Sequence, residues 1–141
     1  MDMLKLTIVY DNHPYDPRLK TGWGFSVLIE FRGQTVLFDT GGDGRILLEN
    51  MQALGIDPTH IQSVVLSHAH GDHTGGLTAL LDGNHKPTVY LLPSFAGAYK
   101  NQVTLLTQVS EVTHGQLIAD GILTTGEITG IIPEQALLVR T

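Results

Sequence analysis

Apolar and polar residues alternate through the first part of the chain, and this alternation predicts strands. Period-two patterns cover residues 4–10, 25–31 and 34–38, as expected for strands that turn one face to a core. Arg32-Gly33 separates the second and third patterns and predicts a hairpin turn. Residues 11–21 carry prolines, an asparagine and aspartates, and therefore predict a loop.

Helical spacing follows the first strands. Apolar residues fall on one face of a helix over residues 45–54, and Gly55 predicts its end. Asp57-Pro58 is typical of a cap followed by proline at the first helical position, and predicts one short turn.

Short apolar runs at residues 63–67 and 88–92 predict buried strands, and residues 75–81 between them suit the start of a helix. Residues 103–113 and 116–128 are predicted to be mostly β. The pattern as a whole predicts one mixed domain over residues 1–141, of the α/β (α+β) class, in which strands outnumber helices.

The most specific motif is the sequence HAHGDH at residues 68–73. It follows a predicted strand and precedes a predicted helix, so it lies on a loop at the carboxyl end of a strand, where open α/β sheets place their sites. Neutral imidazoles and carboxylates are ligands of zinc, iron and manganese. We therefore interpret the motif as a metal site; the alternative is a polar turn on the surface.

The spacing within the motif predicts how the ligands are divided. In an extended loop, His68 and His70 point to the same side and can bind one metal ion. Gly71 permits a turn, which frees Asp72 and His73 to face a second ion. Two-metal sites of this kind activate a bridging water and hold the oxygens of the displaced group. We expect one or two ions, with zinc as the first choice and iron or manganese also open, because no thiolate discriminates among them.

Charge and composition restrict the partners. The net charge is −6 and the calculated pI is about 5.5, so no basic face indicates nucleic acid. The chain has no cysteine, no signal-peptide pattern at its start and no apolar run of transmembrane length. We expect a soluble cytoplasmic protein that acts on a small molecule, without a nucleic-acid or membrane partner.

Two stretches, residues 35–41 (TVLFDTG) and 64–77 (VVLSHAHGDHTGGL), resemble the metallo-β-lactamase superfamily. Residues 10–12 and 124–128 are similar to the branch that contains the dihydropterin-linked ribofuranosylaminobenzene phosphate synthases and many bacterial metallohydrolases. The resemblance implies an αββα-type sandwich, and a metal-bound hydroxide that attacks a phosphoester, ester or lactone. Asp72 would be a metal ligand and the catalytic group that orients or deprotonates the attacking water.

The resemblance also extends to residues outside the motif. Asp39 corresponds to a family aspartate near the metals and would orient a ligand histidine; the alternative is an ordinary residue of a turn at the end of a strand. Asn12 and His13 lie on a loop that borders the substrate in this branch, although a solvated loop histidine is the other interpretation of His13. His114, most simply a turn residue, is a candidate to replace a missing ligand.

Length is where the sequence departs from the family. A domain of this family is generally larger than 141 residues, and in this branch a Gly-Cys-Ser-His-like segment brings a later ligand that this sequence lacks. We therefore expect a truncated domain that resembles the N-terminal half of the fold. The alternative to a hydrolase is a half domain that binds metal weakly and is not catalytic.

A half domain is expected to expose a sheet face. Apolar residues at alternating strand positions would form it and would make a homodimer or larger homo-oligomer. These residues are Val27, Ile29, Val36, Phe38, Val64, Leu66, Val89 and Leu91.

Overall fold

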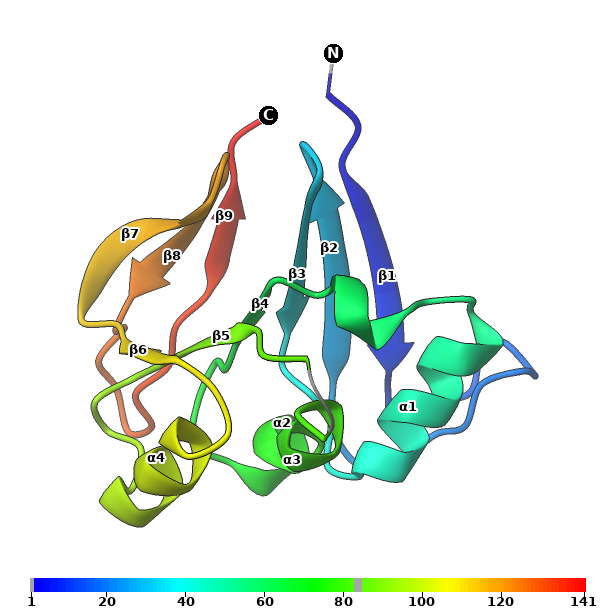
Figure 1. Cartoon of the computed structure of the whole chain (residues 1–141), viewed down its shortest axis with the longest axis horizontal. Coiled ribbons are helices and arrows are strands. Elements are labelled where there is room, and N and C mark those ends of the chain that lie inside the picture. Colours follow the sequence, from blue (N-terminus) through cyan, green and yellow to red (C-terminus); the bar gives the residue numbers. More distant parts are fainter. Residues whose placement is uncertain (1, 83–84) are drawn as a thin grey trace.

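The computed structural model describes residues 2–82 and 85–141. Two sheets pack against each other, and the helices pack against the larger sheet (Figure 1). The larger sheet has six strands in the order β1 to β6, and the smaller has three in the order β7 to β9. The strands are β1 (Lys5–Tyr10), β2 (Ser26–Phe31), β3 (Gln34–Phe38), β4 (Ser63–Val65), β5 (Thr88–Leu91), β6 (Val109–Glu111), β7 (His114–Ala119), β8 (Ile122–Gly126) and β9 (Leu137–Val139).

The larger sheet changes from antiparallel to parallel at β3. Strands β1, β2 and β3 pair antiparallel, whereas β3, β4, β5 and β6 pair parallel. The turn between β2 and β3 is the predicted one, with positive φ at both Arg32 (50°) and Gly33 (73°), which matches the twist of a two-residue hairpin. Because β1 is parallel to β3, the carboxyl ends of β1, β3, β4 and β5 meet at one edge.

Helices cover one face of the larger sheet. They are α1 (Gly44–Ala53), α2 (Gly71–Thr74), α3 (Leu77–Leu80) and α4 (Gly97–Thr104), with one 3₁₀ turn, η1 (Pro58–His60). The predicted end of the first of these is confirmed, since Gly55 follows α1 with φ of 70°. Asp43, which was not predicted as a cap, caps the start of α1. Asp57 caps η1, with Pro58 at its first position, as expected.

Two hydrophobic clusters hold the layers together. The first lies between the larger sheet and the helices and includes Leu37, Leu47 and Val64. The second lies between the two sheets and includes Ile29, Phe31 and Ile122. Burial of both faces of β2 to β4 explains why these strands are rich in apolar residues.

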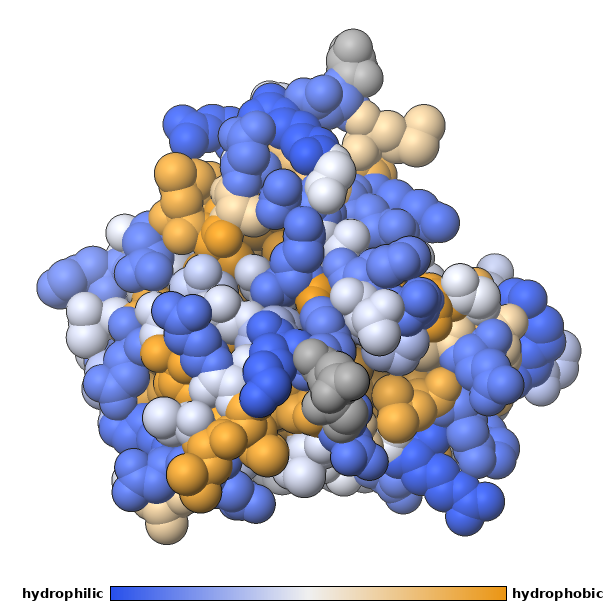
Figure 2. Space-filling model, in the orientation of Figure 1, coloured by the Kyte–Doolittle hydropathy of each residue, from blue (hydrophilic) through white to orange (hydrophobic). Residues whose placement is uncertain are grey.

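The expectation of an exposed sheet face is wrong. Strand register divides the expected residues between two covered faces: Val36 belongs to the cluster between the sheets, and Val64 belongs to the cluster under the helices. Of the eight residues, six are buried, and Val27 and Phe38 are half-buried. On the side drawn in Figure 2, apolar residues form separate patches among hydrophilic ones. A homo-oligomer stays a prediction, but the covered sheet face cannot be its interface.

The second half of the chain departs most from the predicted pattern. Residues 97–104 form α4, so Val103 and Thr104 are helical, and the strand that follows is only β6. The predicted β segment over 116–128 is a hairpin that turns at Gly121, where φ is 76°. His114 is the first residue of β7 instead of a turn residue. Within residues 2–82 and 85–141, no helix is long and apolar enough to cross a membrane.

Candidate metal centre

The candidate site forms where β3 and β4 end. Parallel pairing places Phe38 opposite Val65, so the residues that follow each strand emerge together. Asp39 follows β3, and the loop with His68 and His70 follows β4. The short helix α2 then carries Asp72 and His73 back towards Asp39.

Asp39 is the buried centre of this arrangement, with an exposed fraction of 1%. Its Oδ1 accepts a hydrogen bond from the Ser67 backbone N–H at 2.7 Å, and its Oδ2 accepts one from Ser67 Oγ at 2.6 Å. Oδ2 also lies 2.7 Å from Nδ1 of His73. Asp39 has a φ of 61°, a conformation that aspartate tolerates better than most residues, and Ser26 Oγ donates to its carbonyl at 2.7 Å.

This network assigns the ring protons of two histidines. The His73 Nδ1–H donates to Asp39, which leaves the lone pair on Nε2. The Ser67 hydroxyl donates to Asp39, so the contact of 2.8 Å between Ser67 Oγ and His68 Nδ1 requires the imidazole to be the donor. His68 therefore also carries its lone pair on Nε2.

Three donor groups converge at the site. One ligand atom from each of His68, Asp72 and His73 lies within 4.8 Å of the other two. Asp72 Oδ2 is 3.3 Å from His73 Nε2, and the rings of His68 and His73 have their centroids 4.3 Å apart. Within the described residues, this is the one group of three or more such side chains that is close enough to hold an ion.

The two imidazoles have opposite pKa shifts. The hydrogen bond to Asp39 raises the pKa of His73, and this effect outweighs the burial of the ring. Burial lowers the pKa of His68, and the neighbouring His73 adds to that decrease. At neutral pH, His68 is therefore the more readily available neutral ligand.

His70 stands outside the convergent group. It precedes α2, its side chain is exposed, and its ring meets that of His68 edge-on with centroids 4.8 Å apart. The structure thus groups His68 with Asp72 and His73, whereas the sequence pattern paired it with His70. The assignment of four ligands to two ions stays a prediction.

Asn12 and His13 are not members of this donor group. Asn12 Oδ1 accepts a hydrogen bond of 2.6 Å from the Gly24 backbone N–H. This bond fixes Gly24 beside α2, where an added Cβ would stand 1.9 Å from the carbonyl oxygen of Asp72. Asn12 is therefore linked to α2 through the Gly24 backbone. His114 is exposed at the start of β7 and is not in the donor group.

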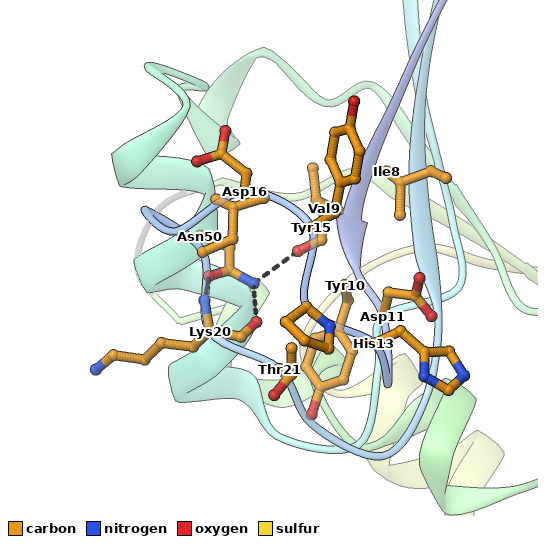
Figure 3. A pocket seen from close by; sticks show the side chains of 12 residues that line it. Ile8, Val9, Tyr10, Asp11, His13, Tyr15, Asp16, Lys20, Thr21 and Asn50 are labelled. Atoms are coloured by element: carbon orange, nitrogen blue, oxygen red, sulfur yellow. Dashed lines mark hydrogen bonds between the residues drawn. The ribbon is translucent and has the colours of Figure 1, made fainter.

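His13 instead lines a mainly apolar cavity of about 480 Å³ between the end of β1, loop 11–21 and α1 (Figure 3). Buried Asn50 fixes this loop: its amide donates to the carbonyls of Val9 and Lys20, both at 2.9 Å, and accepts from Lys20 N–H. The metal candidates at residues 68–73 do not line the cavity.

Sequence reasoning missed three residues that shape the site. Ser67 links Asp39 to His68, and its place directly before the motif was the available signal. Gln135, in the segment before β9, reaches the loop, and Thr124 of β8 donates a hydrogen bond to Gln135. No local pattern marks these two, because the contact of Gln135 with Leu66 spans 69 positions.

Comparison with known proteins agrees with this geometry. The profile of the metallo-β-lactamase superfamily matches residues 22–100, which include β2 to β5 and the whole histidine motif. The chain belongs to the metallo-β-lactamase superfamily. The resemblance inferred from the motifs is therefore confirmed, as is the fold class.

The chain is similar to proteins that have different names and that are longer than the region matched. The 7,8-dihydropterin-6-methyl-4-(β-D-ribofuranosyl)-aminobenzene-5′-phosphate synthase of Methanocaldococcus jannaschii is 32% identical over 83% of this chain, which spans only 40% of that relative. The short form of human tRNase Z has a TM-score of 0.66 at 16% identity, over 99% of this chain and 65% of its own. Zinc-bound PqqB from Methylobacterium extorquens has a TM-score of 0.66 at 18% identity, over 88% and 48%. These two structures show the shared fold.

Proposed function

We propose that this chain carries the metal centre of a metal-dependent hydrolase that acts on a phosphoester, ester or lactone. The observation that carries the proposal is the convergence of His68, Asp72 and His73, with Asp39 bound to the back of His73. A carboxylate behind a ligand imidazole fixes the ring and raises its basicity, as in many zinc sites.

The donor set fits a transition-metal ion. Two imidazoles with Nε2 lone pairs and one carboxylate match the three protein ligands of catalytic zinc sites, which keep a position open for water or substrate. His70 is near enough to His68 to join after a rotation of its exposed side chain. Zinc is the first choice, with iron or manganese as the alternatives.

The residues of the chain would divide the chemistry as follows. A bound ion would lower the pKa of a water and polarise the substrate oxygen. Asp72 is half-buried beside His73, where its carboxylate is placed to orient that water or to accept its proton. Asp39 and Ser67 hold the imidazoles in place throughout, because their hydrogen bonds use Nδ1 and leave Nε2 free.

A phosphoester is the substrate class that we test first. The structural neighbour from human is a tRNase, and the archaeal relative is named for a phosphate-containing product. We expect weak activity from this chain alone, because the donors described here come from one loop and the helix after it, and the leaving oxygen lacks further ligands to hold it.

The test is hydrolysis of bis(4-nitrophenyl) phosphate and 4-nitrophenyl acetate by protein loaded with Zn²⁺, Mn²⁺ or Fe²⁺. We expect slow turnover that stops on chelation and falls to the background rate in Asp72→Asn and His73→Ala. His60→Ala is the matched histidine control, because this side chain is 76% exposed in η1. Turnover that survives chelation or Asp72→Asn would contradict the proposal.

The alternative function is metal binding without hydrolysis. It is favoured by the small donor group, with His70 outside it. Protein that binds the ion through His68, Asp72 and His73 but hydrolyses neither substrate would support this alternative.

A further inference from the structure

A side chain from the segment that leads into β9 reaches the start of the metal loop, the name used here for residues 66–70 between β4 and α2. Gln135 precedes β9 and is buried, with an exposed fraction of 2%. Its amide Nε2 donates to the Leu66 carbonyl at 2.9 Å, and its backbone N–H donates to the Ser67 carbonyl at 2.8 Å. Both carbonyls lie beyond the last residue of β4 and immediately before His68.

These bonds complete the backbone pairing of the two residues before His68. Leu66 N–H donates to the Tyr90 carbonyl at 2.9 Å, and Ser67 N–H donates to Asp39 at 2.7 Å. With Gln135 on both carbonyls, all four backbone polar groups of Leu66 and Ser67 have partners. A segment so paired has little freedom in φ and ψ, so the direction in which the chain enters His68 is fixed.

The orientation of the Gln135 amide is itself determined by a buried neighbour. The Gly126 N–H donates to Thr124 Oγ1 at 3.0 Å, which directs the hydroxyl proton to Gln135 Oε1 at 2.6 Å. The NH₂ group of Gln135 must then face the Leu66 carbonyl. Thr124 is also 2% exposed, so this chain of bonds is shielded from water.

We propose that Gln135, oriented by Thr124, is a positioning residue of the metal centre, which holds the His68 imidazole in its binding geometry without touching it. The proposal rests on the proposed metal site. If the proposal holds, β8 and the segment before β9 support the metal site in addition to covering the larger sheet. Supporting groups of this kind commonly change metal affinity by about 10–100-fold when they are removed.

The test compares isosteric variants with a matched control in metal-loaded and metal-free protein. Gln135→Met and Thr124→Val remove the polar groups at nearly constant volume, and Thr124→Ser restores the hydroxyl. Thr107→Val is the control, because Thr107 is buried and its hydroxyl donates to the Pro87 carbonyl, before β5 and at the opposite edge of the sheet. Urea unfolding of each variant identifies any that does not fold.

Two readouts are measured. The dissociation constant of Co²⁺, followed by its visible absorption, should rise about tenfold or more in Gln135→Met and Thr124→Val, and should stay within about twofold in Thr124→Ser and Thr107→Val. In metal-free protein, hydrogen exchange of a peptide over residues 66–74 should be faster in the first two variants only, while a peptide over α1 keeps its rate.

Unchanged Co²⁺ affinity and unchanged exchange in folded Gln135→Met would overturn the proposal. An equal loss of affinity in Thr107→Val would do the same, because it would make the effect one of global stability. If the unaltered protein does not bind Co²⁺, the proposed metal site fails, and the exchange of residues 66–74 alone decides whether Gln135 fixes the loop.

Discussion

Two loops leave the same edge of the larger sheet and are fixed in different ways. The loop after β4 has its backbone bound by Asp39 and Gln135, and Asp39 and Ser67 also bind the imidazoles of His73 and His68. Loop 11–21 after β1 has its backbone bound by Asn50 at Lys20, whereas its His13 and Tyr15 side chains are exposed. Tyr15 there is fully exposed, at 100%.

In the loop after β4 the ligand side chains are held in place, whereas in loop 11–21 only the backbone is held. Ligand side chains that are held before the ion arrives lose little rotamer freedom on binding, which favours affinity and fixed geometry. Exposed side chains such as His13 and Tyr15 keep that freedom and suit contacts that adapt. The comparison therefore predicts that substitution of Asp39 or Gln135, which hold the metal loop, alters metal binding. Substitution of Asn50, which holds loop 11–21, should alter only stability.

Loss of Asp39 should have the largest effect. Asp39→Ala removes the acceptor of two Ser67 bonds and of the His73 bond, and places alanine at φ of 61°. We expect the free energy of unfolding to fall by about 3 kcal/mol or more, because buried polar partners are left unsatisfied. Urea denaturation measures this. Asp39→Asn keeps the shape and should lose less, and a loss below about 1 kcal/mol in Asp39→Ala would contradict the network.

Gly24→Ala should cause the second-largest loss of stability. Gly24 has φ of 134°, and a Cβ there would meet the carbonyl oxygen of Asp72 at 1.9 Å. We expect a loss of about 2–3 kcal/mol with weaker metal binding, since α2 must move. Gly33→Ala is the control, because Gly33 also has positive φ but has open space around it, so it should cost about 1 kcal/mol and leave metal binding unchanged. Equal effects of the two variants would argue against close packing at α2.

Asn50→Ala tests the other side of the comparison. It removes two hydrogen bonds to Lys20 in loop 11–21 and one to Val9 in β1, so the free energy of unfolding should fall by about 1–3 kcal/mol. Zinc affinity, measured by calorimetry on the folded variant, should stay unchanged. A large loss of affinity would show that the two loops are coupled, through Asn12 and Gly24, and that the distinction drawn here is wrong.

The smallest expected effect is on pH dependence in metal-free protein. NMR titration should place the pKa of His73 above and that of His68 below the ordinary histidine value, because Asp39 stabilises the first imidazolium and burial disfavours the second. The raised pKa of His73 contributes stability that is full below its unfolded pKa and is lost as pH rises through the folded pKa. In Asp39→Asn the pKa of His73 should fall, and a midpoint that does not move would contradict the assignment.

The sequence predicted the parts of this molecule that depend on local pattern. The alternation in β1 to β3, the Arg32-Gly33 turn, the end of α1 at Gly55 and the Asp57-Pro58 start of η1 follow from neighbouring residues, and the structure has them. Helix α4 was missed because its eight residues present one buried apolar side chain, Val103, which is too few for a periodic signal. The apolar pattern over 116–128 does not separate β7 from β8, because the only break is the Asp120-Gly121 turn.

In the site, too, features that depend on neighbouring residues were predictable and those that depend on distant residues were not. The motif at 68–73 named the candidate ligands because they are consecutive, and the position after a strand placed Asp39 near them. The pairing of His68 with His70 assumes an extended loop and stays a prediction. The sequence did not indicate that α2 begins at Gly71 and brings Asp72 and His73 close to His68. Gln135 could not be found, because its role depends on how the smaller sheet packs against β4.

The central claim is that His68, Asp72 and His73 bind one transition-metal ion together. Calorimetric titration of Zn²⁺ into metal-free protein tests it most directly, with His73→Ala beside the exposed control His60→Ala. We predict saturable binding of micromolar or weaker affinity, since all three donors come from residues 68–73, and within the described residues no donor from another part of the chain joins this group. Binding should be lost in His73→Ala and kept in His60→Ala. Absence of saturable binding, or equal binding by His73→Ala, would contradict the account.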